Sequence, residues 1–214
     1  MIADVIPVWL LLSFVTTAPY VIAALRTPQN TVFTGVLTAQ DDTFSYLAWI
    51  KQAAGGRILM RDMFTSEPQQ SRFFLPLWVV LGWTSRLTGL SVAVVFHIAR
   101  LLAALLVLIA ARSVGQCVMK SRTRLRFLVW TVGFSAGLGW AVFAVGDLQS
   151  ILSGKSGVHG YKMGTMPVDI NMPEATVFRS AYSQVHMCLG AAMICGALVL
   201  LIRGITDRNR VYPV

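Results

Sequence analysis

Charged residues, and acidic ones above all, are scarce in this chain. Nine Asp and Glu occur among 214 residues, against 18 Lys and Arg, and the four types together make up 13% of the sequence. Soluble domains carry about twice that share of charge. Because 56% of the residues are apolar and the mean hydropathy is +0.66, the composition excludes an ordinary soluble domain and predicts an integral membrane protein.

Cysteine is also rare, with three residues that form no recognisable disulfide framework. Cys117 lies in a predicted basic loop, whereas Cys188 and Cys195 belong to one apolar helical pattern. The sequence has no His-x-x-x-His or Cys-x-x-Cys pair, so a structural zinc site is not supported. We interpret the three cysteines as packing residues.

Two signatures of nucleotide-dependent enzymes, the phosphate-cradling P-loop and the dinucleotide fingerprint, are missing from the sequence. Chemistry driven by a nucleotide is therefore disfavoured. The net charge of +9 could indicate a nucleic-acid partner. However, the Lys and Arg residues cluster at the ends of apolar runs, where the cytoplasmic bias of membrane proteins explains them, so we expect no nucleic acid among the partners.

Four apolar runs approach or reach the roughly 20 helical residues that cross a bilayer core. They cover residues 5–25, 91–111, 127–146 and 182–202. The run at 73–83 is shorter, and counting it as a span would put the basic stretch 112–126 on the side of the acid-bearing loops. Because Lys and Arg favour the cytoplasmic side, we predict that this run lies in the membrane interface instead.

The predicted fold is an all-α polytopic membrane protein with four transmembrane helices, and with interfacial helices at 42–54 and 74–88 in the first outer loop. The chain 1–214 then forms one membrane domain with both termini in the cytoplasm and membrane lipid around it. Seven of the nine acids lie outside: Asp41, Asp42, Asp62, Glu67, Asp147, Asp169 and Glu174. Only Asp4 and Asp207 remain on the cytoplasmic side.

Two adjacent carboxylates, Asp41 and Asp42, follow the first span and precede an amphipathic pattern that fits a helix on the outer leaflet. A simple role is capping of the N–H groups exposed at the helix N-terminus. A functional alternative is that one acid caps, while the other acts as a general base or helps to hold a divalent cation. The sequence leaves both interpretations open.

The polar segment 63–72 between the two interfacial helices carries Glu67 and Arg72. Its simplest interpretation is a solvated connector. Alternatively, Arg72 contacts a phosphate, because a guanidinium group binds anionic headgroups through two parallel hydrogen bonds. Glu67 would then face a metal ion or support its ligands.

Arg100 lies within the second predicted span, three residues after His97. A charged side chain inside a bilayer costs several kcal/mol unless it faces protein, water or a partner, so Arg100 is a functional candidate. The alternative is that its long side chain extends to the outer interface. We interpret His97 as a polar packing residue.

The second outer loop carries Asp169 and Glu174, and His186 follows near the outer end of the last span. Pro173 and Glu174 fit the first turn of a helix, which gives Glu174 a structural role. Asp169 has no such local role and could join Asp41 and Asp42 at the outer surface. His186 could bind a substrate or donate a proton.

The order of these parts resembles the amino-terminal portion of the GT-C glycosyltransferases, including relatives of protein mannosyltransferases and lipid A aminoarabinose transferases. The likeness covers roughly residues 7–112 and is carried by Asp41-Asp42, the Asp-x-x-x-Tyr pattern ending at Tyr46, Leu75-Pro76-Leu77-Trp78 and Ala99-Arg100-Leu101. Family members have more spans and often a soluble carboxy-terminal domain. The resemblance therefore leaves open that residues 1–214 are a fragment of a longer protein.

The resemblance implies transfer of a sugar from a polyprenyl-phosphate carrier at the outer face of a bacterial cytoplasmic membrane. Asp41 or Asp42 would be the catalytic base, and the isoprenoid tail would lie in a groove open to lipid. Substrate contacts would fall to the remaining candidates, which are Glu67, Arg72, Arg100, Asp169, Glu174 and His186. We also consider a divalent cation as a cofactor, but the sequence identifies no ligands for it.

A non-enzymatic membrane assembly module, or a truncated remnant, explains the same residues differently. In this alternative the acids only cap helices, and small residues such as Gly190, Ala191 and Gly196 pack against the spans of a membrane protein partner. Alanine at Asp41, Asp42 and Asp169 together would then leave function intact.

Overall fold

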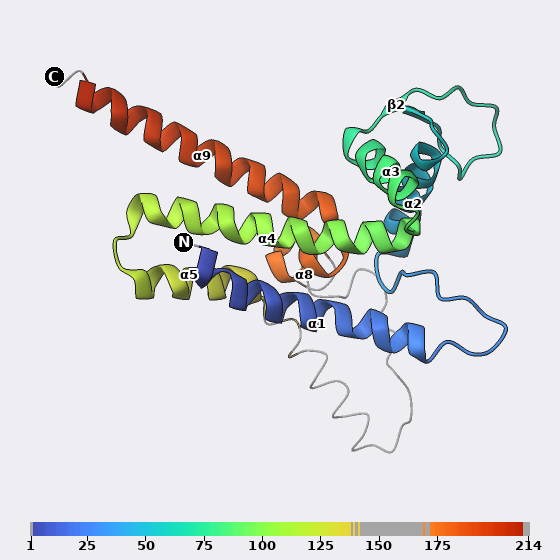
Figure 1. The fold of residues 1–214 in the computed structure, drawn as a ribbon, viewed down its shortest axis with the longest axis horizontal. Coiled ribbons are helices and arrows are strands. Elements are labelled where there is room, and N and C mark those ends of the chain that lie inside the picture. Colours follow the sequence, from blue (N-terminus) through green and yellow to red (C-terminus); the bar gives the residue numbers. More distant parts are fainter. Residues whose placement is uncertain (1, 138, 140, 142–168, 170–171, 212–214) are drawn as a thin grey trace, which may run out of the picture.

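The computed structural model describes residues 2–137, 139, 141, 169 and 172–211, and most of them are helical (Figure 1). The elements are η1 (Ile2–Asp4), α1 (Ile6–Leu25), α2 (Gln40–Ala54), β1 (Leu59–Met60), β2 (Phe73–Phe74), α3 (Pro76–Thr88), α4 (Val92–Val118), α5 (Arg122–Phe134), η2 (Pro173–Ala175), α8 (Val177–Ser183) and α9 (Val185–Val211). Three stretches are long and apolar enough to cross a membrane: Ile2–Leu25, Val92–Val118 and Val185–Thr206. The predicted helical class is confirmed, and three of the four predicted spans coincide with helices that could cross a membrane.

The long helices α1, α4 and α9 form the body of the molecule, with α4 between the other two (Figure 1). The start of α1 and the ends of α4 and α9 lie at one end of this body. At the other end, α2 and α3 pack together beside the start of α4. With 15 and 13 residues, α2 and α3 are shorter than the roughly 20 residues that a span needs.

Several boundaries differ from the sequence-based prediction. The basic stretch 112–126 is largely helical rather than a loop, because α4 continues to Val118 and α5 begins at Arg122, so Cys117 lies in a helix. Of the predicted span 127–146, α5 supplies only the part up to Phe134, and residues 142–146 lie outside the described residues. At the last span, Gln184 is extended and separates α8 from α9.

The α2–α3 pair is held by one close backbone approach. Gly82 in α3 faces α2 so closely that an added Cβ would lie 2.6 Å from the Ile50 carbonyl oxygen, and closer still to the Cβ of Ala53. Only glycine fits there. The antiparallel pair β1–β2, which matches Met60 with Phe73, closes the unit, and Met60 is buried against Ala53 and Val79.

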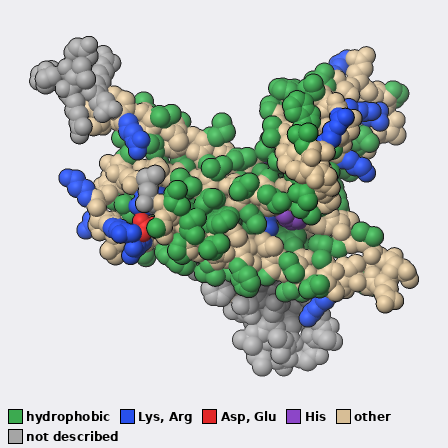
Figure 2. Space-filling model, in the orientation of Figure 1, with side chains coloured by type: hydrophobic (Ala, Val, Ile, Leu, Met, Phe, Trp, Pro, Cys, Tyr) green, Lys and Arg blue, Asp and Glu red, His purple; other side chains and the backbone are tan. Residues whose placement is uncertain are grey.

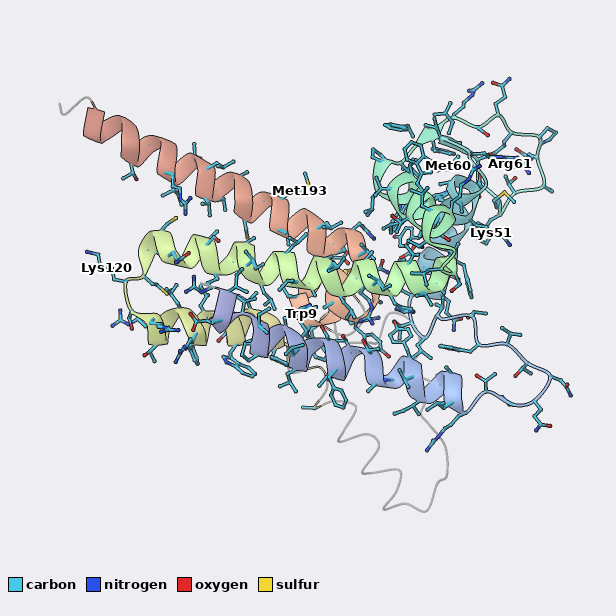
Figure 3. The ribbon with its side chains drawn as sticks, in the orientation of Figure 1. Trp9, Lys51, Met60, Arg61, Lys120 and Met193 are labelled. Carbon is cyan, nitrogen blue, oxygen red and sulfur yellow. The ribbon has the colours of Figure 1, made fainter. Side chains whose placement is uncertain are left out.

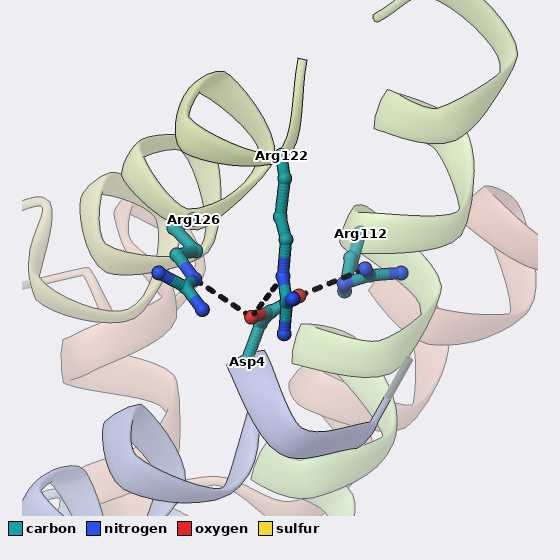
Figure 4. Close-up of polar contacts among 4 residues, drawn as sticks. All are labelled: Asp4, Arg112, Arg122 and Arg126. Atoms are coloured by element: carbon teal, nitrogen blue, oxygen red, sulfur yellow. Dashed lines mark hydrogen bonds and ion pairs between the residues drawn. The ribbon is translucent and has the colours of Figure 1, made fainter. Parts of the chain in front are cut away.

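At the opposite end of the molecule, one buried carboxylate joins three elements (Figure 4). The Asp4 side chain is 2% exposed, and its oxygens accept hydrogen bonds from Arg112 Nη2 at 3.0 Å and Arg126 Nε at 2.8 Å. Arg122 Nε lies 3.4 Å away. These ion pairs tie the chain's beginning to the end of α4 and the start of α5, and they give the buried Arg112 a charged partner.

Asp4→Asn should lower the melting temperature of the detergent-purified protein by several degrees, because the buried Arg112 guanidinium would lose its counter-charge. Tryptophan fluorescence during heating measures this. The matched control is Glu67→Gln, which removes one negative charge from an exposed loop. Equal melting temperatures for the two variants would contradict the structural role assigned to Asp4.

Candidate functional site

Asp41 and Asp42 lie in the first turn of α2, and both are exposed. The N-cap position belongs to Ala39, whose backbone is left-handed at φ +48° and which makes no side-chain capping bond. Neither carboxylate therefore occupies the capping position. Their place near the helix N-terminus still favours negative charge, because the helix dipole is positive there.

One helical turn after Asp42, the ring of Tyr46 packs against the rings of Trp78 and His186, which come from two other helices. The ring of Tyr46 in α2 stacks on that of Trp78 in α3, with centroids 4.7 Å apart. The imidazole of His186 in α9 meets the edge or face of both, at 4.9 Å from Tyr46 and 5.8 Å from Trp78. This cluster fixes the start of α2 over the start of α9.

Two carboxylates act on this cluster. Burial raises the pKa of Tyr46 to about 12, and the negative charges of Asp42 and Glu174 add to the rise. The same two carboxylates are close enough to act electrostatically on His186. The structure thus places Tyr46 and His186 in contact, with Asp42 and Glu174 near enough to influence both electrostatically.

Arg100 lies inside the bundle, where it is 0% exposed, rather than extending to the interface. Its Nη1 donates to the Ala181 carbonyl oxygen at 2.5 Å, and its Nη2 donates to Thr17 Oγ1 at 3.2 Å. The guanidinium carbon lies 5.2 Å from the centre of the Tyr20 ring. One side chain of α4 therefore joins α1 and α8.

His97 links Arg100 to the loop between α1 and α2. Arg100 Nε donates to His97 Nδ1 at 3.3 Å, and His97 Nε2 lies 2.9 Å from the Gly35 carbonyl oxygen. Both contacts are satisfied when Nε2 carries the proton. The prediction of His97 as a polar packing residue fits these contacts, and Gly35, at φ +83°, presents its carbonyl from a backbone that favours glycine.

Sequence analysis did not single out Arg179 in α8. Its Nη1 donates to Thr38 Oγ1 at 3.1 Å and to Ser183 Oγ at 2.9 Å, and its guanidinium carbon lies 5.7 Å from the centre of the Tyr182 ring. Burial lowers the pKa of Arg179. One signal in the sequence could have identified it. Arg179 is a basic residue just before the predicted span 182–202, in a loop that the prediction places on the side of the acidic residues.

Two predicted contacts, Glu67 and Arg72, lie elsewhere. Both are exposed in the loop between β1 and β2, and Arg72 Nη2 donates to Gln70 Oε1 at 3.2 Å. This loop is attached near the end of α2, where Gln52 binds the backbone of Arg61. At 1.5 Å per residue, Gln52 is about 15 Å along the helix from Asp42. The location favours the connector interpretation of this segment.

The hydrogen bond of Asp169 in the described part of the chain is to a backbone N–H group. Its Oδ2 accepts a hydrogen bond from the Gly139 N–H group at 2.9 Å, and its side chain lies against Gly137. Nearby, residues 133–137 match the Gly-x-Ser-x-Gly pattern of a hydrolase nucleophile elbow. An elbow needs a strand before the serine, whereas Ser135 directly follows the helix α5, so this site is not built for that chemistry.

A divalent cation gains no support from the geometry. Within the described residues, no three His, Cys, Asp or Glu side chains are grouped closely enough to hold a metal ion. What the site does offer is the exposed carboxylate of Asp42, the half-buried phenol of Tyr46 and imidazole of His186, and the fully buried guanidinium group of Arg100 within the bundle.

Arg100→Lys should lower the melting temperature nearly as much as Arg100→Gln, because one ammonium group cannot reach Thr17, His97 and Ala181 together. Thermal unfolding in detergent measures the difference. Arg203→Lys, on the exposed part of α9, is the control and should leave the melting temperature unchanged. A native melting temperature for Arg100→Lys would show that charge alone satisfies the site.

Comparison with known proteins finds no matching protein family, no similar curated protein and no similar solved structure. A function for this chain therefore rests on its residues and their geometry.

Proposed function

We propose that this chain is a GT-C-like glycosyltransferase, or the amino-terminal part of one, that transfers a sugar from a polyprenyl-phosphate donor at the outer membrane face. The observation that carries the proposal is the position of Asp42. It stands at the exposed start of α2, one helical turn before Tyr46, and its charge acts on Tyr46 and His186, in line with the base that the resemblance implies.

In this proposal Asp42 takes a proton from the acceptor hydroxyl, and Asp41 adds to the local negative charge. The exposure of Asp42 favours the role, because a base must reach its substrate. His186 and Tyr46 offer hydrogen-bonding groups for a sugar.

A positive charge behind these groups favours an anionic donor. Among the described residues, no carboxylate forms an ion pair with Arg100. A row of rings connects it with the surface cluster: Phe96 lies 5.7 Å from His97 and 6.4 Å from Trp78, centroid to centroid. A donor phosphate near the start of α4 would be attracted by this charge.

The proposal includes a topology with both termini in the cytoplasm of a bacterial cell and a fourth span that begins within α5. The basic residues of α5 and of the loop before it, Lys120, Arg122, Arg124 and Arg126, support the orientation, because this end would face the cytoplasm. In that arrangement α2 and α3 lie at the outer interface. Their exposed apolar side chains, which include Phe44, Val80, Trp83 and Leu87, suit that depth.

A non-enzymatic assembly module is the second candidate, and α9 favours it. Along this helix Gly190, Gly196 and Gly204 face open space, and apolar side chains between and beyond them are exposed, including Met193, Ile194, Leu198, Leu200, Leu201 and Ile205. Small residues on an exposed helix face allow close packing of a partner span. The module would keep its function when Asp41, Asp42 and Asp169 are replaced together by alanine, and the enzyme would not.

Asp42→Asn should reduce transfer from a polyprenyl-phosphate sugar by about 100-fold or more, the usual contribution of a general base. Purified protein, a radiolabelled donor and thin-layer separation of the products measure the rate. Asp62→Asn, an exposed acid of the β1–β2 loop, is the control and should retain the native rate. Native turnover by a folded Asp42→Asn variant would refute the catalytic role.

Cysteine placed at position 42 of a cysteine-free variant should react in intact cells with a membrane-impermeant maleimide, because the proposed topology exposes the start of α2 outside. Cysteine at position 120 should react only after the cells are made permeable. The reverse pattern would show that the chain is inserted in the opposite orientation.

A further inference from the structure

An open groove of about 460 Å³ lies on the α2–α3 unit, toward the other end of α2 from Asp42. The second half of α2 forms one wall, with Lys51, and the segment that follows β1 forms the other, with Arg61 (Figure 3). Arg57 is the third cation of the lining, and Ala48 and Met63 give it an apolar part. At 1.5 Å per residue, Lys51 stands about 14 Å along the helix from Asp42.

The charge of this groove is not compensated by the chain. No acidic residue lines it, and in the described part of the chain none of its three cations forms an ion pair with a carboxylate. The nearest acid in sequence, Asp62, accepts the Phe64 N–H group at 2.9 Å and lines, with Glu67, an adjoining hollow that shares Arg61 and Met63 with the groove. Figure 2 shows the Lys and Arg side chains gathered on this part of the surface.

The two walls of the groove are fixed to each other. Gln52 Nε2 donates to the Arg61 carbonyl oxygen at 3.0 Å, and the Arg61 N–H group donates to Gln52 Oε1 at 3.1 Å. Beneath them Met60 is fully buried. The ammonium group of Lys51 and the guanidinium groups of Arg57 and Arg61 suit a compact anion with several oxygen atoms, because each guanidinium can form two parallel hydrogen bonds.

A structural role accounts for only part of this charge. Lys51 lies in the last turn of α2, where a cation complements the negative end of the helix dipole. Arg57 and Arg61 lie beyond the helix, and Arg61 is separated from it by the start of the hairpin. The helix dipole therefore does not account for Arg57 and Arg61 in this groove, and we interpret them as ligand-binding residues.

The surroundings indicate where that ligand comes from. Exposed apolar side chains border the groove, including Ile58, Leu59, Met63 and Phe64. Such a mixture of aromatic, aliphatic and basic groups is typical of a surface at the boundary between lipid and water. We propose that the groove binds a phosphate group, as the headgroup of a membrane lipid or as free phosphate. This site would operate whether or not the chain is a glycosyltransferase.

The test uses the full chain in a neutral detergent and a fluorescent phosphatidic acid, whose binding is followed by fluorescence anisotropy. The double variant Arg57→Gln/Arg61→Gln should bind the lipid about tenfold more weakly or worse, because charge-assisted hydrogen bonds are lost. Ala48→Trp fills the groove without changing its charge and should also weaken binding. The control Lys120→Gln/Arg124→Gln removes the same charge from exposed residues near α5 and should keep the native affinity.

Competition separates the two sources of phosphate. Displacement of the probe by inorganic phosphate at equal concentration supports a free anion, whereas displacement only by phosphate-bearing lipid supports the headgroup. A lipid without phosphate that binds as well as phosphatidic acid overturns the proposal. Native affinity in both groove variants, or an equal loss in the α5 control, overturns it too. If the double variant melts below the assay temperature, Lys51→Gln replaces it under the same criteria.

Discussion

The arrangement of the end of the bundle that carries α2 and α3 depends on the burial of one positive charge. Arg100 is enclosed by protein, and three of its N–H groups are used by a carbonyl oxygen of α8, a hydroxyl of α1 and an imidazole of its own helix. Because an unsatisfied buried charge is costly, these partners must stay in place in the folded protein. His97 extends these contacts to the Gly35 carbonyl oxygen, and so holds in place the loop between α1 and α2.

The two ends of the bundle satisfy their buried cations in different ways. Near the termini, the carboxylate of Asp4 meets three guanidinium groups, which leaves that end with a surplus of positive charge. At the end that carries α2 and α3, Arg100 is met by neutral oxygen and nitrogen atoms, so no carboxylate in the described part of the chain cancels its charge. Burial by neutral partners suits a binding site, and burial by a carboxylate suits a structural joint.

The sequence was informative wherever the signal was local. Hydropathy located α1, α4 and α9, and the helix predicted at 74–88 matches α3 at Pro76–Thr88. Pairings between distant residues could not be read in this way, since Asp4 and Arg112, which form an ion pair, are 108 positions apart. The same limit hid Arg179, whose partner Thr38 is 141 positions away, and it left Glu67 and Arg72 grouped with a site from which α2 separates them.

The contact at Gly82 has a mechanical consequence. With the backbones of α2 and α3 in direct touch there, and with Met60 wedged beside them, the two helices and their hairpin can shift only as a rigid body. That body is joined to the rest of the protein by the loop before α2 and by the turn at Gly89, whose φ is +71°. Any displacement that brings the basic groove toward or away from the lipid must therefore swing Asp42 in the same stroke, so occupancy at one end of α2 is mechanically coupled to the position of the carboxylate at the other.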